Sequence, residues 1–274
     1  MIATWALFRK NIGDARWMLL IIGSALFGLA WLFVYVTHNF EASIRASLGG
    51  GPAVRMLRGL GGNAMNSSTA AIEMVFWNRE VVLLMLAIWA IARGSAAVAG
   101  EIERGTMDMI LSRPITRLAY LNAQVASALV GLGLLVGAMI AGNQVGAHYN
   151  TLNDPPSLLL LSKPALNLVA FGAAIYGYTL FLSTVDLVRW RPILIASVAT
   201  LAGFIALILA NIPTLEAWKP TLERVSIFKA VSAVEIVTKG ETFAFNTGIL
   251  GLVGLIGLVL GYVAFLNRDL PAGS

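Results

Sequence analysis

Six long apolar runs dominate this sequence of 274 residues. Each run has about the 20 residues that a helix needs to cross the hydrocarbon core of a bilayer. Because the runs are continuous rather than alternating, they exclude a transmembrane barrel and favour helices, which pair every backbone polar group internally. The sequence therefore predicts an all-α polytopic membrane protein, a single domain over residues 1–274. The expected spans are Trp17–Thr37, Val81–Ala99, Leu118–Gly142, Ala165–Val185, Pro192–Asn211 and Thr247–Leu266.

The composition favours a bilayer over a soluble environment. Hydrophobic residues make up 58% of the chain and charged residues 12%, with a mean hydropathy of +0.80, whereas soluble domains carry about 25% charged residues. The net charge of +5 is attributed to topology and lipid contacts and not to nucleic-acid binding. Because cysteine is absent, disulfides and thiolate metal sites are excluded.

Six spans place both termini on the same side of the membrane. Nine Lys and Arg residues flank the spans on each side, so their number does not decide the orientation. Those on the side of the termini lie closer together and nearer to span ends, which predicts that both termini are cytoplasmic. Residues 1–16 alternate apolar with charged side chains, a pattern that favours an interfacial N-terminal helix over a simple charged flank.

Three connections are expected on the other side, at residues 38–80, 143–164 and 212–246. The first is rich in glycine and is interpreted as a flexible linker, in which Pro52–Leu60 can form a short basic amphipathic turn. The last has apolar residues at helical spacing over Leu215–Lys239, which predicts an amphipathic helix. The first and last connections could gate a substrate path, or they could only cap the helices.

A short charged segment separates the second span from the third. In Gly100–Leu111, apolar residues are interleaved with Glu101, Glu103, Arg104 and Asp108, so the segment is too polar to span and is expected to lie along the membrane surface as a helix. The proline that follows ends this helix, because proline is tolerated only in a first helical turn. A rigid helix between two spans is suited to receive a force and to tilt both spans together.

This segment resembles the signature of the ABC-2 type transporter permeases, roughly Gly-Glu-x-Glu-x-Gly-Thr, a hydrophobic run, Leu-x-x-Pro and a basic residue. The layout is also similar, with an N-terminal interfacial helix, six spans and this segment between the second and third spans. One departure is Gln124, at a position early in the third span where family members often carry lysine. The matching residues are Gly100, Glu101, Glu103, Gly105, Thr106, Leu111, Pro114 and Arg117.

The resemblance implies a coupling helix seated in a groove of a separate ATP-binding subunit. The two glutamates would contact that subunit or the neighbouring span ends, and Gly105 would permit close approach. The arginines near the proline would hold the membrane interface or pair with the acids; the alternative is an ordinary solvated loop. The expected interface is Gly100, Glu101, Glu103, Arg104, Gly105, Thr106, Asp108, Arg113, Pro114 and Arg117, with a minor contact at Asp186, Arg189 and Arg191.

The resemblance further implies a permease subunit of an ABC exporter in a cell inner membrane. It would form a homodimer and bind two ATPase subunits, which would hold ATP and magnesium. The chain lacks a GxxxxGK[ST] run, so it is not expected to be an enzyme or to bind a cofactor. The rival classes are a secondary transporter or channel, which would need intramembrane acids or broken repeats, and a membrane scaffold. The composition of the spans does not identify a substrate.

A few polar and small residues stand out within the spans. Arg93 carries the only formal charge in a span, and it is either functional or snorkels to the interface. Asn122 and Gln124 could form hydrogen bonds across helices. The pairs Gly133/Gly137 and Gly257/Gly261 allow close helix contacts, within one chain or between two. With two histidines and few nearby acids, no metal site is expected.

Overall fold

The structure is a computed structural model that describes residues 2–46, 80–112, 115–150, 157–210, 212–231, 233, 236 and 243–268. The described residues form helices and turns and include no strand. The long helices are α1 (Ile2–Ala46), α4 (Glu80–Ala97), α7 (Arg117–Tyr149), α8 (Leu158–Val185), α9 (Trp190–Ala210) and α12 (Phe243–Asn267). The short ones are α5 (Ala99–Glu103), α6 (Met107–Leu111), η3 (Pro213–Trp218), α10 (Lys219–Val225) and η4 (Ile227–Ala230).

The six long helices are long and apolar enough to cross a membrane. On α9 and α12 large apolar side chains remain exposed along the whole helix, for example Leu194, Leu201 and Leu255. A soluble fold would bury such faces, whereas lipid is an equally apolar solvent for them. The structure thus confirms the predicted all-α polytopic membrane fold with six membrane-spanning helices.

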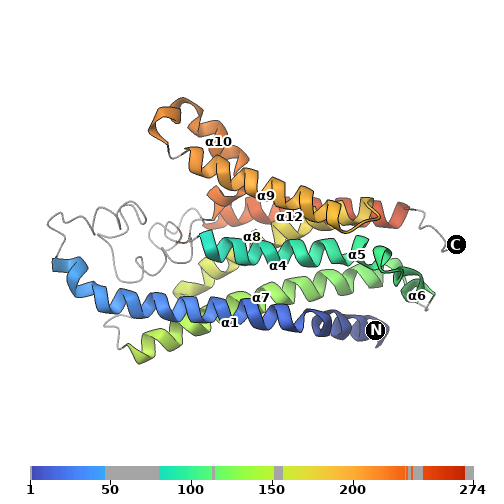
Figure 1. Cartoon of the computed structure of the whole chain (residues 1–274), viewed down its shortest axis with the longest axis horizontal. Helices are drawn as coiled ribbons and strands as arrows, with labels where there is room; N and C mark the ends of the chain where they lie inside the picture. Colours follow the sequence, from blue (N-terminus) through green and yellow to red (C-terminus); the bar gives the residue numbers. More distant parts are fainter. Residues whose placement is uncertain are drawn as a thin grey trace.

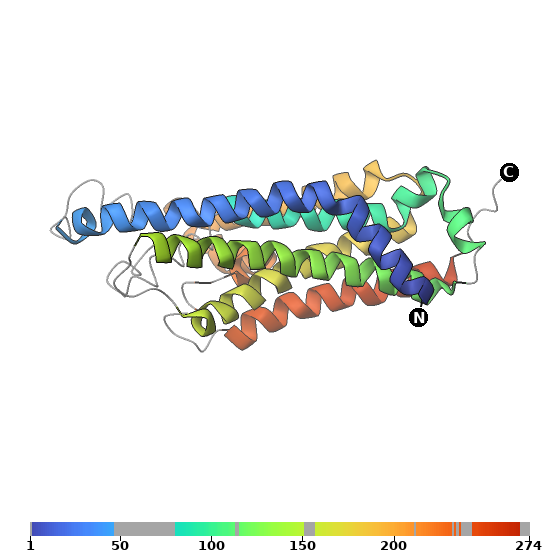
Figure 2. The ribbon, with the colours of Figure 1, turned by 90° about the horizontal axis from the view of Figure 1, so that it is seen from below.

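The helices pack as one elongated bundle built around α8 (Figure 1). Helix α8 packs along α12 and α4, while α1 packs along α7. The start of α1, the end of α12 and the α5–α6 segment lie together at one end of the bundle, which we call the terminal end (Figures 1 and 2). The opposite end, which carries α10, is called the distal end.

The N-terminal segment and the first span are one continuous helix rather than two elements. Helix α1 begins at Ile2 and continues to Ala46, although its N-terminal part bends away from the rest (Figure 2). The sequence from residue 1 to residue 46 lacks proline, so no residue is forced to interrupt the backbone hydrogen bonds. The residues 38–46, expected in a connection, therefore belong to the helix.

The helices of the third and fourth spans are also longer than predicted. Helix α7 continues to Tyr149, and α8 begins at Leu158 with Pro164 inside it. Ser157 caps α8, because its hydroxyl accepts a hydrogen bond from the backbone N–H of Leu160 at 3.3 Å. A side-chain cap thus fixes the start of α8 six residues before Pro164, whereas the sequence analysis placed the start of this span directly after that proline.

The connection between α9 and α12 is not the single amphipathic helix expected over Leu215–Lys239. Its described part includes η3, α10 and η4, and Ser226 between the last two has an extended backbone (φ −87°, ψ 113°). Phe228 is buried against Phe171 of α8 and Phe204 of α9, with ring centroids 5.1 and 5.5 Å apart. We attribute the break in the helix to the burial of this ring, which stabilises the connection more than continuous helical hydrogen bonds would. The predicted turn at Pro52–Leu60 lies outside the described residues.

Glycines set the contact between α8 and α12. A Cβ built on Gly257 would lie 2.4 Å from the carbonyl carbon of Gly177, and one on Gly177 would lie 2.4 Å from the Gly254 carbonyl oxygen. The two backbones therefore touch, as the predicted Gly257/Gly261 contact requires. A Cβ on Gly133 or Gly137 would meet nothing within 4 Å, so this second pair makes no such contact within the chain.

Helix α8 carries a polar anchor at its distal part. The side-chain amide of Asn167 donates hydrogen bonds to the carbonyl oxygen of Ala230 and to the Thr247 hydroxyl, both at 3.1 Å. Asn167 is almost fully buried. This side chain therefore fixes both the 227–230 turn and the start of α12 to α8.

Candidate functional site

The charged segment between α4 and α7 is a pair of short helices and not the single helix predicted over Gly100–Leu111. Helices α5 and α6 are separated by a turn at Arg104 and Gly105. Gly105 has a φ of +67°, and a Cβ built on it would meet nothing within 4 Å. The glycine is thus explained by a left-handed backbone that other residues adopt at a cost. Within this chain it permits no close approach.

A buried serine supports the break between α4 and α5. The Ser183 hydroxyl of α8 accepts hydrogen bonds from the backbone N–H groups of Val98 and Ala99, at 3.3 and 2.9 Å, and donates one to the carbonyl oxygen of Ser95 at 3.0 Å. It therefore replaces part of the backbone bonding that is lost where α4 ends. Gly100, the first matching residue, follows this junction and is buried beside the side chain of Arg189.

Glu101 faces into the protein. It is only 4% exposed, and its carboxylate accepts a hydrogen bond from Arg104 at 2.7 Å and another from the Thr106 hydroxyl. Lys10 of α1 lies 3.7 Å from the same carboxylate. These contacts lie within the segment and with the N-terminal part of α1, and they tie α5 to α1. The expected contact of Glu101 with an ATP-binding subunit stays a prediction.

Glu103 connects α5 to the short loop before α9. Its carboxylate accepts a hydrogen bond from the backbone N–H of Arg189 at 2.7 Å. Within that loop, the Asp186 carboxylate accepts hydrogen bonds from the N–H groups of Leu187 and Val188, and Arg191 lies 3.7 Å from it. The two regions that the sequence analysis assigned to a major and a minor contact are therefore adjacent.

Two arginines at the terminal end, Arg117 and Arg268, bind backbone carbonyls. Arg117, at the start of α7, donates to the carbonyl oxygens of Phe265 and Arg268, at 3.3 and 2.7 Å. Arg268 in turn donates to the carbonyl oxygens of Thr184 and Asp186, at 2.5 and 3.0 Å. These bonds satisfy helix-end carbonyls and join α7, α12 and α8. Arg113 and Pro114 lie outside the described residues.

The α5–α6 segment also has an outward face. Glu103, Arg104 and Asp108 are exposed, and Met109 on α6 is 64% exposed. By contrast, Met107 is buried in the main apolar core. The segment is therefore anchored on one side and presents charged and apolar groups on the other.

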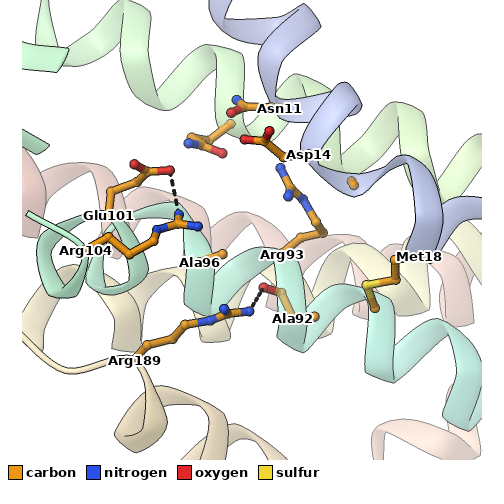
Figure 3. A pocket seen from close by; sticks show the side chains of 11 residues that line it. Asn11, Asp14, Met18, Ala92, Arg93, Ala96, Glu101, Arg104 and Arg189 are labelled. Carbon is orange, nitrogen blue, oxygen red and sulfur yellow. Dashed lines mark hydrogen bonds and ion pairs between the residues drawn. The ribbon is translucent and has the colours of Figure 1, made fainter. Parts of the chain in front are cut away.

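A cavity of about 160 Å³ lies between this segment and the helices beside it. Its polar lining comes from α1, α4, α5, α7 and the loop before α9 (Figure 3). Arg93 lines it, with the guanidinium carbon 5.9 Å from the centroid of the Trp89 ring. Figure 3 shows the Arg93 side chain directed toward Asp14 of α1. Arg93 thus lines a polar cavity of the protein, and its functional and snorkelling interpretations both stay predictions. The polar residues that line the cavity are Asn11, Asp14, Arg93, Glu101, Arg104, Gln124 and Arg189.

Of the other two polar residues predicted within the spans, Asn122 forms a hydrogen bond between helices, whereas Gln124 forms one within α7. Gln124 donates to the hydroxyl of Tyr120 at 2.9 Å, and Tyr120 donates to the carbonyl oxygen of Ala97 at the end of α4. Asn122 accepts a hydrogen bond from Tyr262 of α12 at 2.6 Å. Within the described part of the chain no group of three or more His, Asp and Glu residues could hold a metal ion.

Several residues of this region were missed by sequence reasoning. Lys10, Asn11 and Asp14 lie in α1, far from the signature in sequence, and Ser183 is one of several hydroxyl-bearing residues in an apolar span. The helical spacing of Lys10 and Asp14, four residues apart, was a usable signal that both lie on one face. Nothing in the sequence indicated which helix that face would contact.

The fold and this region define a multi-pass integral membrane protein whose charged segment joins two spans. The chain matches the family described as ABC-2 family transporter protein over residues 5–270. It therefore belongs to that family and is a transmembrane permease of the ABC transporter class, the membrane subunit that generally works with ABC ATPase partners and is normally not catalytic. A comparison with curated proteins finds no match.

Proposed function

We propose that this permease is the membrane half of an exporter driven by ATP hydrolysis on a separate subunit. The terminal end would face the cytoplasm, and two ATP-binding subunits would dock on two copies of this chain. ATP and magnesium would then be bound by those subunits and not by this one. The observation that carries the proposal is the α5–α6 segment, which is anchored inward and exposes an outward face.

The outward face has the chemistry of a docking surface. Met109 is a large exposed apolar side chain in a five-residue helix, with Asp108 beside it and Glu103 and Arg104 nearby. A flexible apolar anchor surrounded by charges resembles the core and rim of a protein interface. Here the charged rim would give orientation, while the methionine would fill a groove of the partner.

Force applied to this face would reach three helices through the contacts of the segment. The Glu101–Lys10 pair leads to α1, the Ser183 hydrogen bonds lead to α8, and the Glu103–Arg189 hydrogen bond leads to the start of α9. Each of these contacts is polar and can be exchanged for another partner or for water. Movement of one packed element against others is how such transporters switch between states.

The test is co-purification of the chain with a co-expressed ABC ATP-binding subunit from the same genome, followed by measurement of ATP hydrolysis. Met109→Glu places a charge at the center of the proposed docking face and should reduce recovery of the complex by at least about tenfold, the effect of losing one hot-spot contact. Trp218→Glu is the matched control, because Trp218 is also 64% exposed but lies in η3 at the distal end. It should leave the complex intact.

Two results would contradict the proposal. The first is a chain that binds no ATP-binding subunit and instead moves substrate with an ion gradient, as a secondary transporter does. The second is equal loss of the complex in both variants, which would place the docking surface elsewhere. Export as opposed to import is tested separately, by following accumulation of a labelled substrate in inside-out vesicles.

A further inference from the structure

The cavity beside the α5–α6 segment has an excess of hydrogen-bond donors. Three arginines line it, Arg93, Arg104 and Arg189, against two carboxylates, Asp14 and Glu101, so the lining carries one net positive charge. Arg104 donates hydrogen bonds to the Gly100 carbonyl oxygen and to the Glu101 carboxylate, and Arg189 donates one to the Ala92 carbonyl oxygen. Arg93 is therefore the arginine of this lining that keeps a buried donor without a partner among the described residues.

Two buried donors have no acceptor among the residues that the structure describes. One is the side-chain nitrogen Nδ2 of Asn11, a residue that is 5% exposed, and the other is Nε of Arg93. They come from α1 and α4, and both residues line the cavity (Figure 3). Leaving a buried donor unpaired costs about 1–3 kcal/mol, and more for a charged one. An acceptor between α1 and α4 would remove this cost.

The acceptor that fits is an anion with several oxygens. The unpaired donors of Asn11 and Arg93 come from α1 and α4, so a tetrahedral oxyanion can be contacted from two helices. Arginine forks match phosphate oxygens, and such charge-assisted bonds are stronger than neutral ones. A single excess positive charge suits a phosphate group that carries one negative charge.

The cavity also lies near the level expected for lipid headgroups. Trp17 of α1 and Trp190 at the start of α9 are both exposed, and an arginine stacks on each ring, Arg16 and Arg191, respectively. Exposed tryptophans flanked by cations mark the membrane–water interface. Asp14 and Arg104, at the rim of the cavity, are themselves exposed, so the cavity communicates with the surroundings.

We infer that this cavity binds a phosphate group between α1 and α4, with Asn11 and Arg93 as its innermost donors. The group can belong to an anionic lipid headgroup or to a soluble phosphate, and both present the same oxygens. Bound there, it would join α1 to α4 beside the α5–α6 segment. The inference rests on the cavity alone and holds whether or not the proposed function is correct.

The test is thermal unfolding of the purified full chain in detergent, titrated with four probes in separate arms. Sodium phosphate is compared with sodium chloride at equal ionic strength, and dioleoylphosphatidylglycerol is compared with dioleoylphosphatidylcholine. A ligand that binds the folded state raises the unfolding midpoint with a saturation curve that yields an apparent Kd. We expect such a curve for phosphate, for phosphatidylglycerol, or for both, and not for chloride.

Variants assign any such effect to the cavity. Arg93→Gln removes a charged donor, and Asn11→Asp keeps the size of the side chain but replaces its donor with a negative charge. Each should raise the apparent Kd on the order of tenfold or more. Arg16→Gln is the control, because Arg16 lies on α1 near Asn11 but does not line the cavity; it should change the Kd by less than about twofold.

The outcomes separate the sources of phosphate and decide the proposal. A response to phosphatidylglycerol alone identifies a lipid headgroup, and a response to sodium phosphate identifies a soluble ligand; both support the site if Arg93→Gln or Asn11→Asp weakens the response. The proposal is overturned if no probe shifts the midpoint of the wild type. It is also overturned if the folded variants bind as tightly as the wild type or if Arg16→Gln weakens binding equally.

Discussion

The α8–α12 contact and the terminal end around α5–α6 hold helices together in opposite ways. Along α8 and α12 the backbones touch at Gly177, Gly254 and Gly257, without intervening side chains. At the terminal end, α5 reaches its neighbours through Glu101, Glu103 and the Ser183 hydroxyl, around a cavity that polar groups line. One region is close-packed, and the other is polar and partly open.

The difference teaches which part of the bundle can move. Backbone contact through small residues has no alternative arrangement of similar energy, because any shift opens gaps or creates clashes. Hydrogen bonds to carboxylates and hydroxyls can be exchanged for bonds to water or to a partner protein at small net cost. We therefore expect α8 and α12 to move as one unit and the α5–α6 segment to move relative to α1.

The largest effect is expected from breaking the close-packed contact. Gly257→Val would place side-chain atoms where the backbone of Gly177 lies, and neither backbone can yield locally. We expect a loss of at least about 3 kcal/mol in stability, or failure to fold. Gly251→Val on the same helix is the control, since a Cβ there would meet nothing within 4 Å. Unfolding in increasing concentrations of a denaturing detergent measures the stability of both variants. Equal losses of stability would show that the effect comes from helix propensity and not from the lost backbone contact.

A smaller effect is expected from the buried carboxylate of the terminal end. Glu101→Gln keeps the shape of the side chain but removes the charge that Arg104 and Lys10 face. Charge-assisted hydrogen bonds contribute about 1.5–3 kcal/mol each, so we expect a loss of about 2 kcal/mol in the same unfolding measurement.

Asp108→Asn on the adjacent α6 removes the same charge from an exposed position and should change stability by less than about 0.5 kcal/mol. A large effect of Asp108→Asn, or no effect of Glu101→Gln, would contradict the assignment of Glu101 as the anchor of the segment.

The smallest effect is expected from an exposed ion pair at the terminal end, between Arg191 and Asp186. Arg191 and Asp186 form an ion pair at 3.7 Å in which the arginine is more than half exposed. Exposed pairs contribute about 0–1 kcal/mol and are screened by salt. Arg191→Ala should therefore lower stability by less than about 0.5 kcal/mol, measured at low and at high salt. A salt-independent loss above about 1 kcal/mol would show that this pair belongs with the buried contacts.

Sequence reasoning recovered the fold better than the site because apolar length is a local property and side-chain pairing is not. The six runs predicted the six spans, since a bilayer accepts few other solutions. Helix ends were set less well, as at Pro164, where the cap at Ser157 decides the boundary. The break at Gly105 could have been predicted, because this glycine lies between two short polar stretches. The glycine is also part of the signature.

The partners within the site depended on which helices become neighbours. Lys10 and Glu101 are 91 positions apart, and no pattern in either segment indicates the other. The same holds for Ser183, a small polar residue of a kind often found in spans. The coupling role of the segment came from a family resemblance, and the physical pattern alone predicted only a charged surface helix.

The polar anchors of α8 have a thermodynamic consequence. Ser183 binds the α4–α5 junction near the terminal end, and Asn167, 16 residues earlier, binds the 227–230 turn near the distal end. At 1.5 Å per residue they lie about 24 Å apart on one helix. Suppose that a partner bound at one end shifts α8 as a unit and thereby changes the affinity for a ligand at the other end by some factor. Linkage then requires that the ligand change the affinity for the partner by the same factor. Occupancy at one surface of the membrane would then be measurable as a change in binding at the other.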